Sequence, residues 1–258
     1  MKSKKAHNLR TLKKAKASQK LQMLTCYDYQ TARLLDETTL DMILVGDSLG
    51  NVILGLPTTV PVQVDDMITF GKAVVRGAPN TFVVVDMPFG SYAYFEQALE
   101  NAIKIFQKTQ CQALKLEGAN EEVYRMISAL TQHGIPVMGH IGLTPQSVHQ
   151  MGGYYTHGKE LSSIERLKQQ AKGLERAGCF SIVLECVTEE VAKEITTELE
   201  IPTIGIGSGE HTDGQVLVIN DLLKMGPDKP PSFCSPIADL YELKKSLITG
   251  HLDNETNS

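Results

Sequence analysis

The chain has 258 residues, of which 42% are hydrophobic and 21% are charged, and its formal net charge at pH 7 is −5. This composition is ordinary for a globular protein. No apolar stretch approaches the roughly 18 residues of a membrane-spanning helix, so we expect no membrane span and no secretory signal. The five cysteines are scattered and none forms a Cys-x-x-Cys pair, which argues against a zinc or redox motif and favours a cytoplasmic protein.

Residues 1–20 contain eight Lys or Arg and no acidic residue, so the remainder of the chain carries about −13. Such a basic arm is typical of nucleic-acid binding or organelle targeting. The alternative is a helix that is solvated or packed on a partner, because Leu9, Leu12 and residues 15–17 form a weak apolar stripe. We favour the helix and expect no nucleic-acid partner, because an acidic body would repel a phosphate backbone.

The remaining chain alternates short, branched apolar runs with longer amphipathic segments, which is the pattern of buried parallel strands and covering helices. The predicted strands are 21–28, 42–47, 81–86, 113–117, 136–140, 181–186, 203–206 and a short eighth at 215–219. The predicted helices are 29–38, 64–77, 95–108, 121–133, 162–177 and 188–199, with a poor last helix from 221 onward. Ser162 and Glu165 have the spacing of a capping box. Segments 48–61 and 141–159 are rich in Gly and Pro and are predicted to be loops.

Eight strands alternating with helices in a chain of this length predict a (β/α)₈ barrel of the TIM type. A doubly wound open sheet is the alternative, because the eighth strand is short and its helix is weak. No linker-like tract divides the chain. We therefore expect one barrel domain over 1–258, with 1–20 as an N-terminal helical arm and 226–258 as a C-terminal tail.

Four of the apolar runs end in a carboxylate, at Asp47, Asp86, Glu117 and Glu185. In a barrel these acids would line the mouth at the carboxyl ends of the strands, together with Asp28 and His140. Clustered carboxylates can stay ionised around a divalent cation, and hard oxygen ligands without paired Cys or His favour magnesium over zinc. For any single acid, helix capping or a surface salt bridge is the competing explanation.

Three further features lie close to these strand ends. Lys115 stands two residues before Glu117, so both side chains point into the barrel, with the lysine one layer deeper. It would neutralise the acids, bind an anionic substrate or act as a structural counter-ion. His140 would contact a substrate oxygen, orient a carboxylate or fill the core. The glycine-rich run 205–209 would bind a phosphate or form a tight turn, and it lacks the spacing of a dinucleotide-binding motif.

Several motifs occur in one order over about residues 20–221: MLTCYD at 23–28, VGDSLG at 45–50, DMPF at 86–89, KLEG at 115–118, GHIGLTPQ at 139–146, LECV at 184–187, IGIGSG at 204–209 and DGQ at 213–215. On these motifs the chain resembles the ketopantoate hydroxymethyltransferase (3-methyl-2-oxobutanoate hydroxymethyltransferase) family. It departs from the family at Ser208, where alanine is usual, at Asn220-Asp221, where His-Asp is usual, and in the tail from Met225 onward, which matches poorly.

The resemblance implies a (β/α)₈ barrel that binds Mg²⁺ and uses 5,10-methylenetetrahydrofolate as co-substrate. The family transfers a hydroxymethyl group to 3-methyl-2-oxobutanoate and so forms 2-dehydropantoate (ketopantoate), a step of pantothenate and coenzyme A biosynthesis. By motif, Asp47 and Asp86 bind the metal and the substrate, and Glu117 binds the metal directly or through water. Ser48 and Lys115 bind the oxo acid, and Glu185 is the general base. Family members also form ring-based homo-oligomers, commonly decamers.

Two rival hypotheses remain at this point. Another magnesium-dependent barrel enzyme acting on 2-oxo acids, such as a carbon–carbon or carbon–phosphorus lyase, would share the metal chelate but need no folate. A catalytic cysteine in the loop 141–159 would favour such a lyase, and that loop contains none. A non-catalytic paralogue would account for the divergent tail. The length of the loop 141–159 is compatible with a lid over the site or with an ordinary surface loop.

Overall fold

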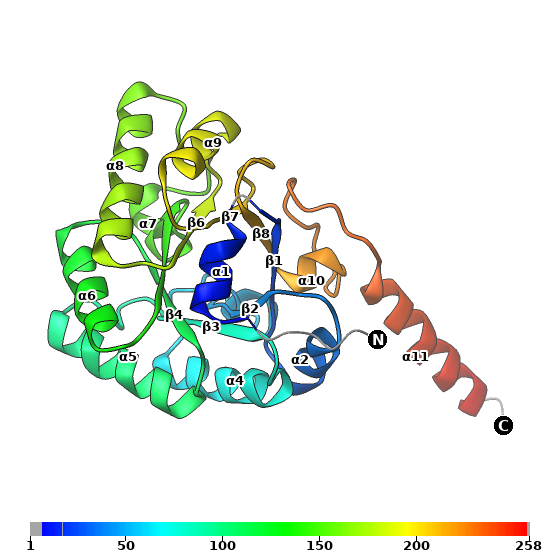
Figure 1. Cartoon of the computed structure of the whole chain (residues 1–258). Helices are drawn as coiled ribbons and strands as arrows, with labels where there is room; N and C mark the ends of the chain where they lie inside the picture. Colours follow the sequence, from blue (N-terminus) through cyan, green and yellow to red (C-terminus); the bar gives the residue numbers. More distant parts are fainter. Residues whose placement is uncertain (1–6, 17, 257–258) are drawn as a thin grey trace. The chain divides into compact units, whose positions relative to one another are not determined.

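The structure is a computed structural model that describes residues 7–16 and 18–256. Eight parallel strands form a closed barrel in which neighbours in the sequence are neighbours in the sheet (Figure 1). This confirms the predicted (β/α)₈ barrel, and closure excludes the open sheet. The strands are β1 (Leu21–Thr25), β2 (Met42–Val45), β3 (Phe82–Asp86), β4 (Ala113–Glu117), β5 (Val137–Gly142), β6 (Ser181–Glu185), β7 (Thr203–Ile206) and β8 (Gly214–Leu217).

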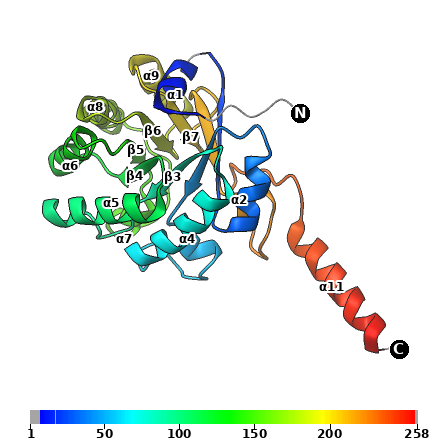
Figure 2. The ribbon, with the colours of Figure 1, turned by 60° about the horizontal axis from the view of Figure 1, so that its bottom comes forward.

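The outer helices surround the strands, as the second view shows (Figure 2). They are α2 (Tyr29–Asp36), α4 (Val64–Gly77), α5 (Phe95–Thr109), α6 (Glu121–Gln132), α8 (Leu161–Ala177) and α9 (Glu189–Glu198). Each buries one apolar stripe; in α5, Ala98, Ala102 and Ile105 are fully buried at helical spacing. Helix α6 begins where the Asn120 side chain accepts a hydrogen bond from the backbone N–H of Val123, which satisfies a helix-end donor.

Most predicted elements differ from the observed ones only at their ends, and a few differ more. Helix α8 begins at Leu161 with Glu160 as its N-cap, so the capping box predicted at Ser162 is wrong. The predicted loops contain the short helices α3 (Leu49–Val52), η1 (Pro145–Ser147) and α7 (Val148–Met151). The tail contains a long helix, α11 (Leu240–Thr256). As predicted, no helix lies between β7 and β8, which residues 207–213 connect.

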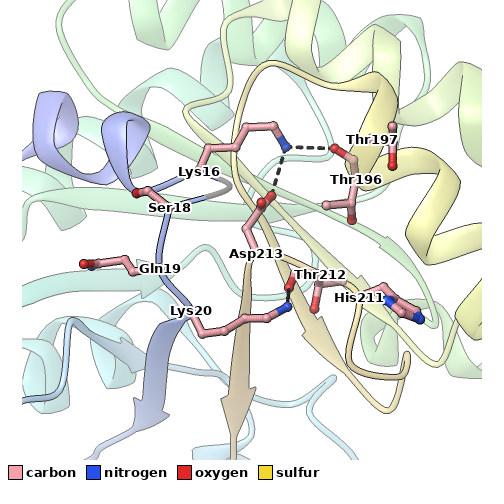
Figure 3. Close-up of a pocket in the computed structure, with 9 residues that line it drawn as sticks. All are labelled: Lys16, Ser18, Gln19, Lys20, Thr196, Thr197, His211, Thr212 and Asp213. Carbon is pink, nitrogen blue, oxygen red and sulfur yellow. Dashed lines mark hydrogen bonds and ion pairs between the residues drawn. The ribbon is translucent and has the colours of Figure 1, made fainter.

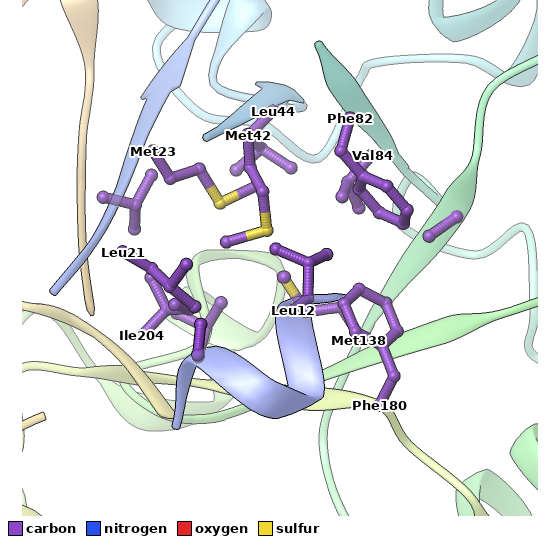
Figure 4. Packing of buried hydrophobic residues seen from close by; sticks show 14 of the residues in the cluster. Leu12, Leu21, Met23, Met42, Leu44, Phe82, Val84, Met138, Phe180 and Ile204 are labelled. Atoms are coloured by element: carbon purple, nitrogen blue, oxygen red, sulfur yellow. The ribbon is translucent and has the colours of Figure 1, made fainter. Parts of the chain in front are cut away.

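The barrel interior has an apolar layer near the strand starts and a polar layer near the strand ends. Inward-facing residues of the strands form one buried cluster that includes Met42, Phe82 and Ile204. The rings of Phe82 and Phe180 meet edge to face with centroids 5.7 Å apart. Leu12 of helix α1 (Leu9–Ala15) belongs to the same cluster and is 1% exposed (Figure 4). The N-terminal helix therefore packs on the apolar end of the barrel.

The chain around α1 is anchored where the connection between β7 and β8 has no helix. Lys16 Nζ donates to the Thr196 carbonyl at 2.8 Å and lies 3.0 Å from Asp213 Oδ2 (Figure 3). Lys20 donates to the carbonyls of Glu210 and Thr212. Both lysines, with Thr196, Thr212 and Asp213, line a surface cavity of about 580 Å³ beside the residues that precede β1 and β8. The described basic residues of the arm thus include two that bind the barrel; residues 1–6 and 17 lie outside the described part.

The chain divides into two compact units, Met1–Val216 and Leu217–Ser258. The first contains α1, the strands β1–β7 and the outer helices. The second contains α10 (Ile219–Leu222) and α11, on which Leu243, Leu247, Ile248 and Leu252 are exposed. Organisation as one domain over 1–258 stays a prediction. Within the described residues, no helix combines the length and the apolar character needed to span a membrane.

Candidate active site

Three of the predicted acids come together at the polar end of the barrel. Asp86 and Glu117 are the last residues of β3 and β4, and Asp47 lies two residues after the end of β2, directly after Gly46. The backbone N–H of Asp47 donates to Asp86 Oδ2 at 3.1 Å. Gln146 links Asp47 to Glu117, because its side-chain amide donates to Asp47 Oδ2 at 2.8 Å and its backbone N–H donates to Glu117 Oε2 at 3.1 Å. Residues distant in sequence thus form one buried cluster.

Lys115 is the cation at the centre of this cluster. It is aligned with Asp86 in the sheet register, one inward-facing layer below Glu117. Its Nζ lies 2.7 Å from Asp86 Oδ1 and 3.9 Å from Glu117 Oε1. Burial alone would lower the pKa of Lys115, but the charges of Asp86, Glu117 and Asp47 outweigh it and raise the pKa. The ammonium group is therefore charged throughout the physiological range.

His140 connects the acid cluster to Glu185. The sheet register pairs Glu117 with His140, and Gly142 with Glu185. His140 Nδ1 lies 3.2 Å from Glu117 Oε1, and its Nε2 lies 3.2 Å from Glu185 Oε2. Burial opposes protonation of this imidazole, but Glu117 and Glu185 raise its pKa to about 9. The charged imidazole in turn lowers the pKa of Glu117 against the effect of burial. Because the Glu185 side chain is 17% exposed, it is the most accessible acid of the group.

The charges of this site are not balanced by the protein alone. Burial and the neighbouring carboxylates raise the pKa of Asp47 well above its ordinary value, and burial raises the pKa of Asp86 despite its ion pair with Lys115. With Glu117 and Glu185, the acids outnumber the two cationic groups and leave a formal excess of two negative charges. That excess equals the charge of one divalent cation, so the donor set fits Mg²⁺.

Magnesium does not need a closed cage of protein ligands. Across residues 7–16 and 18–256, no group of three or more His, Cys, Asp or Glu side chains has an arrangement that would hold a metal ion by itself. Mg²⁺ is usually bound by one or two carboxylates that leave further positions for water and substrate oxygens. Asp47 and Asp86 can supply those carboxylates, with Glu117 as a partner through water.

Ser48 lies beside the acids, and its hydroxyl contacts the hydroxyl of Tyr27, which lies two residues after β1. The hydroxyls of Tyr27 and Ser48 are 2.8 Å apart. This approach depends on Gly46, because a Cβ there would lie 2.8 Å from Ser48 Oγ and 3.5 Å from Asp86 Oδ2. The sequence VGDS thus places a half-buried hydroxyl next to two carboxylates.

Two features of the strand ends lie outside the cluster. Asp28 is exposed and caps α2, where it accepts a hydrogen bond from the backbone N–H of Thr31 at 2.8 Å. Its predicted place in the ring of acids is therefore wrong, and the competing explanation of helix capping is the observed one. In the glycine-rich run 205–209, the buried Ser208 hydroxyl donates to the Leu184 carbonyl at 2.8 Å and accepts from the Val187 N–H at 3.0 Å.

The loop after β5 is attached at both ends to the backbone around Glu185. The N–H of Leu143 donates to the Glu185 carbonyl at 2.8 Å, and the N–H of His157 donates to the Cys186 carbonyl at 2.7 Å. Gly142 has φ +94°, and a Cβ there would lie 2.2 Å from the Glu185 carbonyl oxygen. Only glycine fits this close approach. The loop therefore begins and ends beside the most accessible acid of the site.

Sequence reasoning missed two residues that complete the cluster. Gln146 ends the motif GHIGLTPQ, which predicts no role for it, and Tyr92 lies in none of the ordered motifs. In the structure, the Tyr92 hydroxyl donates to Gln146 Oε1. Neither residue follows a strand directly and neither side chain carries a charge at neutral pH. Burial, followed by the charges of Glu117 and Asp47, raises the pKa of Tyr92 well above its usual value. No simple signal in the sequence points to either residue.

The sequence profile of the ketopantoate hydroxymethyltransferase family matches residues 6–254. The chain belongs to the ketopantoate hydroxymethyltransferase family. The chain is 49% identical over 253 residues to 3-methyl-2-oxobutanoate hydroxymethyltransferase of Exiguobacterium sp., covering 97% of this chain and 91% of the relative. Against the enzyme of the same name from Thermotoga maritima it is 52% identical over 237 residues, covering 92% and 87%. The resemblance inferred from the ordered motifs is thereby confirmed.

The fold is shared with enzymes that are much more distant in sequence. A solved phosphonopyruvate hydrolase superposes with a TM-score of 0.62 at 9% identity, covering 97% of this chain and 99% of that protein. At this identity the likeness shows a common barrel and nothing about activity. Membership of the ketopantoate hydroxymethyltransferase family makes the chain an enzyme of the transferase class.

Proposed function

We propose that this chain transfers a hydroxymethyl group from 5,10-methylenetetrahydrofolate to 3-methyl-2-oxobutanoate, with bound Mg²⁺, and so forms 2-dehydropantoate for pantothenate biosynthesis. The observation that carries the proposal is the buried cluster of Asp47, Asp86 and Glu117 around Lys115, in a chain about half identical to named hydroxymethyltransferases. The cluster lies at the carboxyl ends of the strands, where barrel enzymes place their chemistry.

The oxo acid is a small anion, and the site offers it a cation and a hydroxyl. Mg²⁺ held by Asp47 and Asp86, with Glu117 close by, would act as a Lewis acid toward the carboxylate and keto oxygens of the substrate. The charged Lys115 attracts the substrate carboxylate and stabilises negative charge that develops during the reaction. Ser48, held by Tyr27 at 2.8 Å, donates a further hydrogen bond to the oxo acid.

Glu185 is proposed as the general base that removes the proton from C3 of 3-methyl-2-oxobutanoate. It is the most accessible acid of the site, and it lies on a different strand from the residues proposed to bind the metal. His140 Nε2 lies 3.2 Å from Glu185 Oε2, so the charged imidazole attracts this carboxylate. The resulting carbon nucleophile bonds to the one-carbon unit of the folate, water supplies the hydroxyl oxygen, and the two C–N bonds to that carbon break so that tetrahydrofolate leaves. The loop that is attached on both sides of Glu185 is placed to limit access of water.

The test is a coupled assay of the wild-type protein with both substrates, with and without a chelator. We expect product formation that stops in the presence of chelator and returns with added Mg²⁺, and we expect Asp86→Asn to abolish turnover. Turnover of the oxo acid without a folate donor would favour a lyase. Failure to bind Mg²⁺ and the oxo acid by titration calorimetry would favour a non-catalytic paralogue, and either result contradicts the proposal.

Three wider properties follow from the same family membership. We infer a cytoplasmic enzyme that assembles into a ring-based homo-oligomer, with a decamer as the expected form. We also infer that residues 1–258 act as one barrel domain carrying the helical arm and the tail. Light scattering of the purified chain tests the assembly, with a monomer as the contradicting result.

A further inference from the structure

Gln146 connects four segments of the polar end of the barrel. Its side-chain amide donates to Asp47 Oδ2 at 2.8 Å and to the Met87 carbonyl at 2.9 Å. Its Oε1 accepts from the Tyr92 hydroxyl, and its backbone N–H donates to Glu117 Oε2 at 3.1 Å. Asp47 follows β2, Met87 and Tyr92 follow β3, and Glu117 ends β4, while Gln146 itself lies in η1 after β5. At 5% exposure, the residue has a protein partner for each of its side-chain polar groups.

We propose that Gln146 is the positioning residue that holds Asp47 and Glu117 in the arrangement required to bind magnesium. The inference deepens the proposed function and rests on it. Gln146 is not a catalytic residue in this scheme, because it acts through the two carboxylates and not on the substrate.

The chemistry of the amide suits this role better than that of a charged donor. A lysine or arginine next to Asp47 would compete with a cation for the carboxylate, whereas a neutral amide donates a hydrogen bond and leaves the negative charge available. Hydrogen bonds to ionised acceptors are shorter and stronger than neutral ones, so the amide can set the orientation of the carboxylate. One Asp47 oxygen is committed to Gln146, which restricts the rotation of the carboxylate.

The orientation of the amide is itself determined by its surroundings. The carbonyl of Met87 and the carboxylate of Asp47 are acceptors only, so the NH₂ group must face them. The Tyr92 hydroxyl completes the arrangement by donating to Oε1. An amide with each polar group partnered has one favourable orientation, and it transmits that order to Asp47, while the backbone N–H of Gln146 holds Glu117. The Tyr92 hydroxyl also lies 3.5 Å from the Glu117 carbonyl oxygen, so Tyr92 contacts the cluster through the Gln146 side chain and through that backbone group.

The experiment measures Mn²⁺ binding to the substrate-free protein by the electron paramagnetic resonance signal of free Mn²⁺. Gln146→Met keeps the length of the side chain and removes every hydrogen bond of its amide. Loss of a partner that orients metal ligands typically weakens metal binding by about 10–100-fold, and we expect this increase in the Mn²⁺ dissociation constant. The KM for the oxo acid should rise with it, while kcat at saturating metal and substrate should fall much less.

Two further variants separate positioning from packing. Gln112→Met is the control for loss of a glutamine hydrogen bond away from the acids, because the exposed Gln112 side chain accepts a hydrogen bond from the Val83 N–H at 2.7 Å directly before β4. It should bind Mn²⁺ like the wild type. Tyr92→Phe should weaken Mn²⁺ binding in the same direction as Gln146→Met but by less, because it frees the amide without removing it. If Gln146→Met does not fold, Tyr92→Phe decides the question.

A folded Gln146→Met protein with the wild-type Mn²⁺ dissociation constant would overturn the inference, as would a Tyr92→Phe protein with unchanged affinity where Gln146→Met cannot be purified. In both cases the wild type would still bind Mn²⁺ and form product, so the proposed function would stand. A wild-type protein that neither binds Mn²⁺ nor forms product would overturn the proposed function, and the inference with it.

Discussion

Replacement of Lys115 by methionine tests whether the acid cluster is held together by charge. Lys115 and Lys104 each form an ion pair with an aspartate at 2.7 Å, but the Lys115 side chain is 4% exposed and the Lys104 side chain is 47% exposed. The two pairs therefore have the same N–O distance and differ in burial. Breaking a buried pair by removing one partner costs about 3–5 kcal/mol, because the remaining charge is buried without compensation. An exposed pair contributes less than about 1 kcal/mol.

We expect Lys115→Met to lower the free energy of unfolding by about 3–5 kcal/mol at pH 7, and Lys104→Met to lower it by less than about 1 kcal/mol. The assay is urea unfolding followed by circular dichroism, at one protein concentration and with a chelator present, so that only the charges of the protein contribute. Added Mg²⁺ should restore part of the stability of Lys115→Met, because a divalent cation supplies the missing positive charge.

The pH dependence supplies an independent check of the same argument. Burial raises the pKa of Asp47 and Asp86 in the folded protein. A carboxyl group with a higher pKa in the folded than in the unfolded chain binds its proton more tightly when folded, so its ionisation penalty disappears as the pH falls through the folded-state pKa. The deficit of Lys115→Met should therefore be smaller at pH 5 than at pH 7. Equal losses for the two lysine variants, or a deficit that grows on acidification, would refute the reasoning.

Three other expectations follow from single features of the structure. Glu185→Gln should lower kcat by about 10²–10⁴-fold, the usual contribution of a general base, with little change in the KM for the oxo acid; near-normal turnover in a steady-state assay would remove it as the base. Because burial raises the pKa of the Cys26 and Cys179 thiols to about 12, both should resist alkylation at pH 8 until the protein unfolds, as peptide mass spectrometry can show. Ser208→Ala should lower the free energy of unfolding by about 1–3 kcal/mol, because the buried Val187 N–H loses its acceptor; an unchanged urea midpoint would contradict this.

The fold was predictable because each strand carries its own signal. Runs such as 82–86 and 182–184 are short, branched and buried on both faces, and only parallel strands covered by helices accommodate that pattern. The sequence predicts no helix between the seventh and eighth strands, and the structure has none there. Helix α11 was missed because its apolar residues do not form a single stripe, so its periodicity is weak.

The acids of the site were predictable for a geometric reason, and the limits of that reason are visible in Asp28. Parallel strands of a closed barrel all end at one rim, so a carboxylate directly after a strand must lie there. The rule places the backbone but not the direction of the side chain. Strand β1 ends at Thr25, three residues before Asp28, so the side chain of Asp28 has already reached the first turn of α2 and satisfies that helix end.

Gln146 is the opposite case, because its proposed role depends on its contacts and neither charge nor periodicity in the sequence indicates it. Its place is set by the loop after β5, which Gly142 allows to pass within contact of the Glu185 carbonyl. That turn brings Gln146 back over β2, β3 and β4, where its amide meets Asp47 and the Met87 carbonyl. Acids at the strand ends can therefore be inferred from the strands alone, whereas the neutral groups that orient them depend on the paths of several loops. The Mn²⁺ affinities of Gln146→Met and Tyr92→Phe measure that dependence directly.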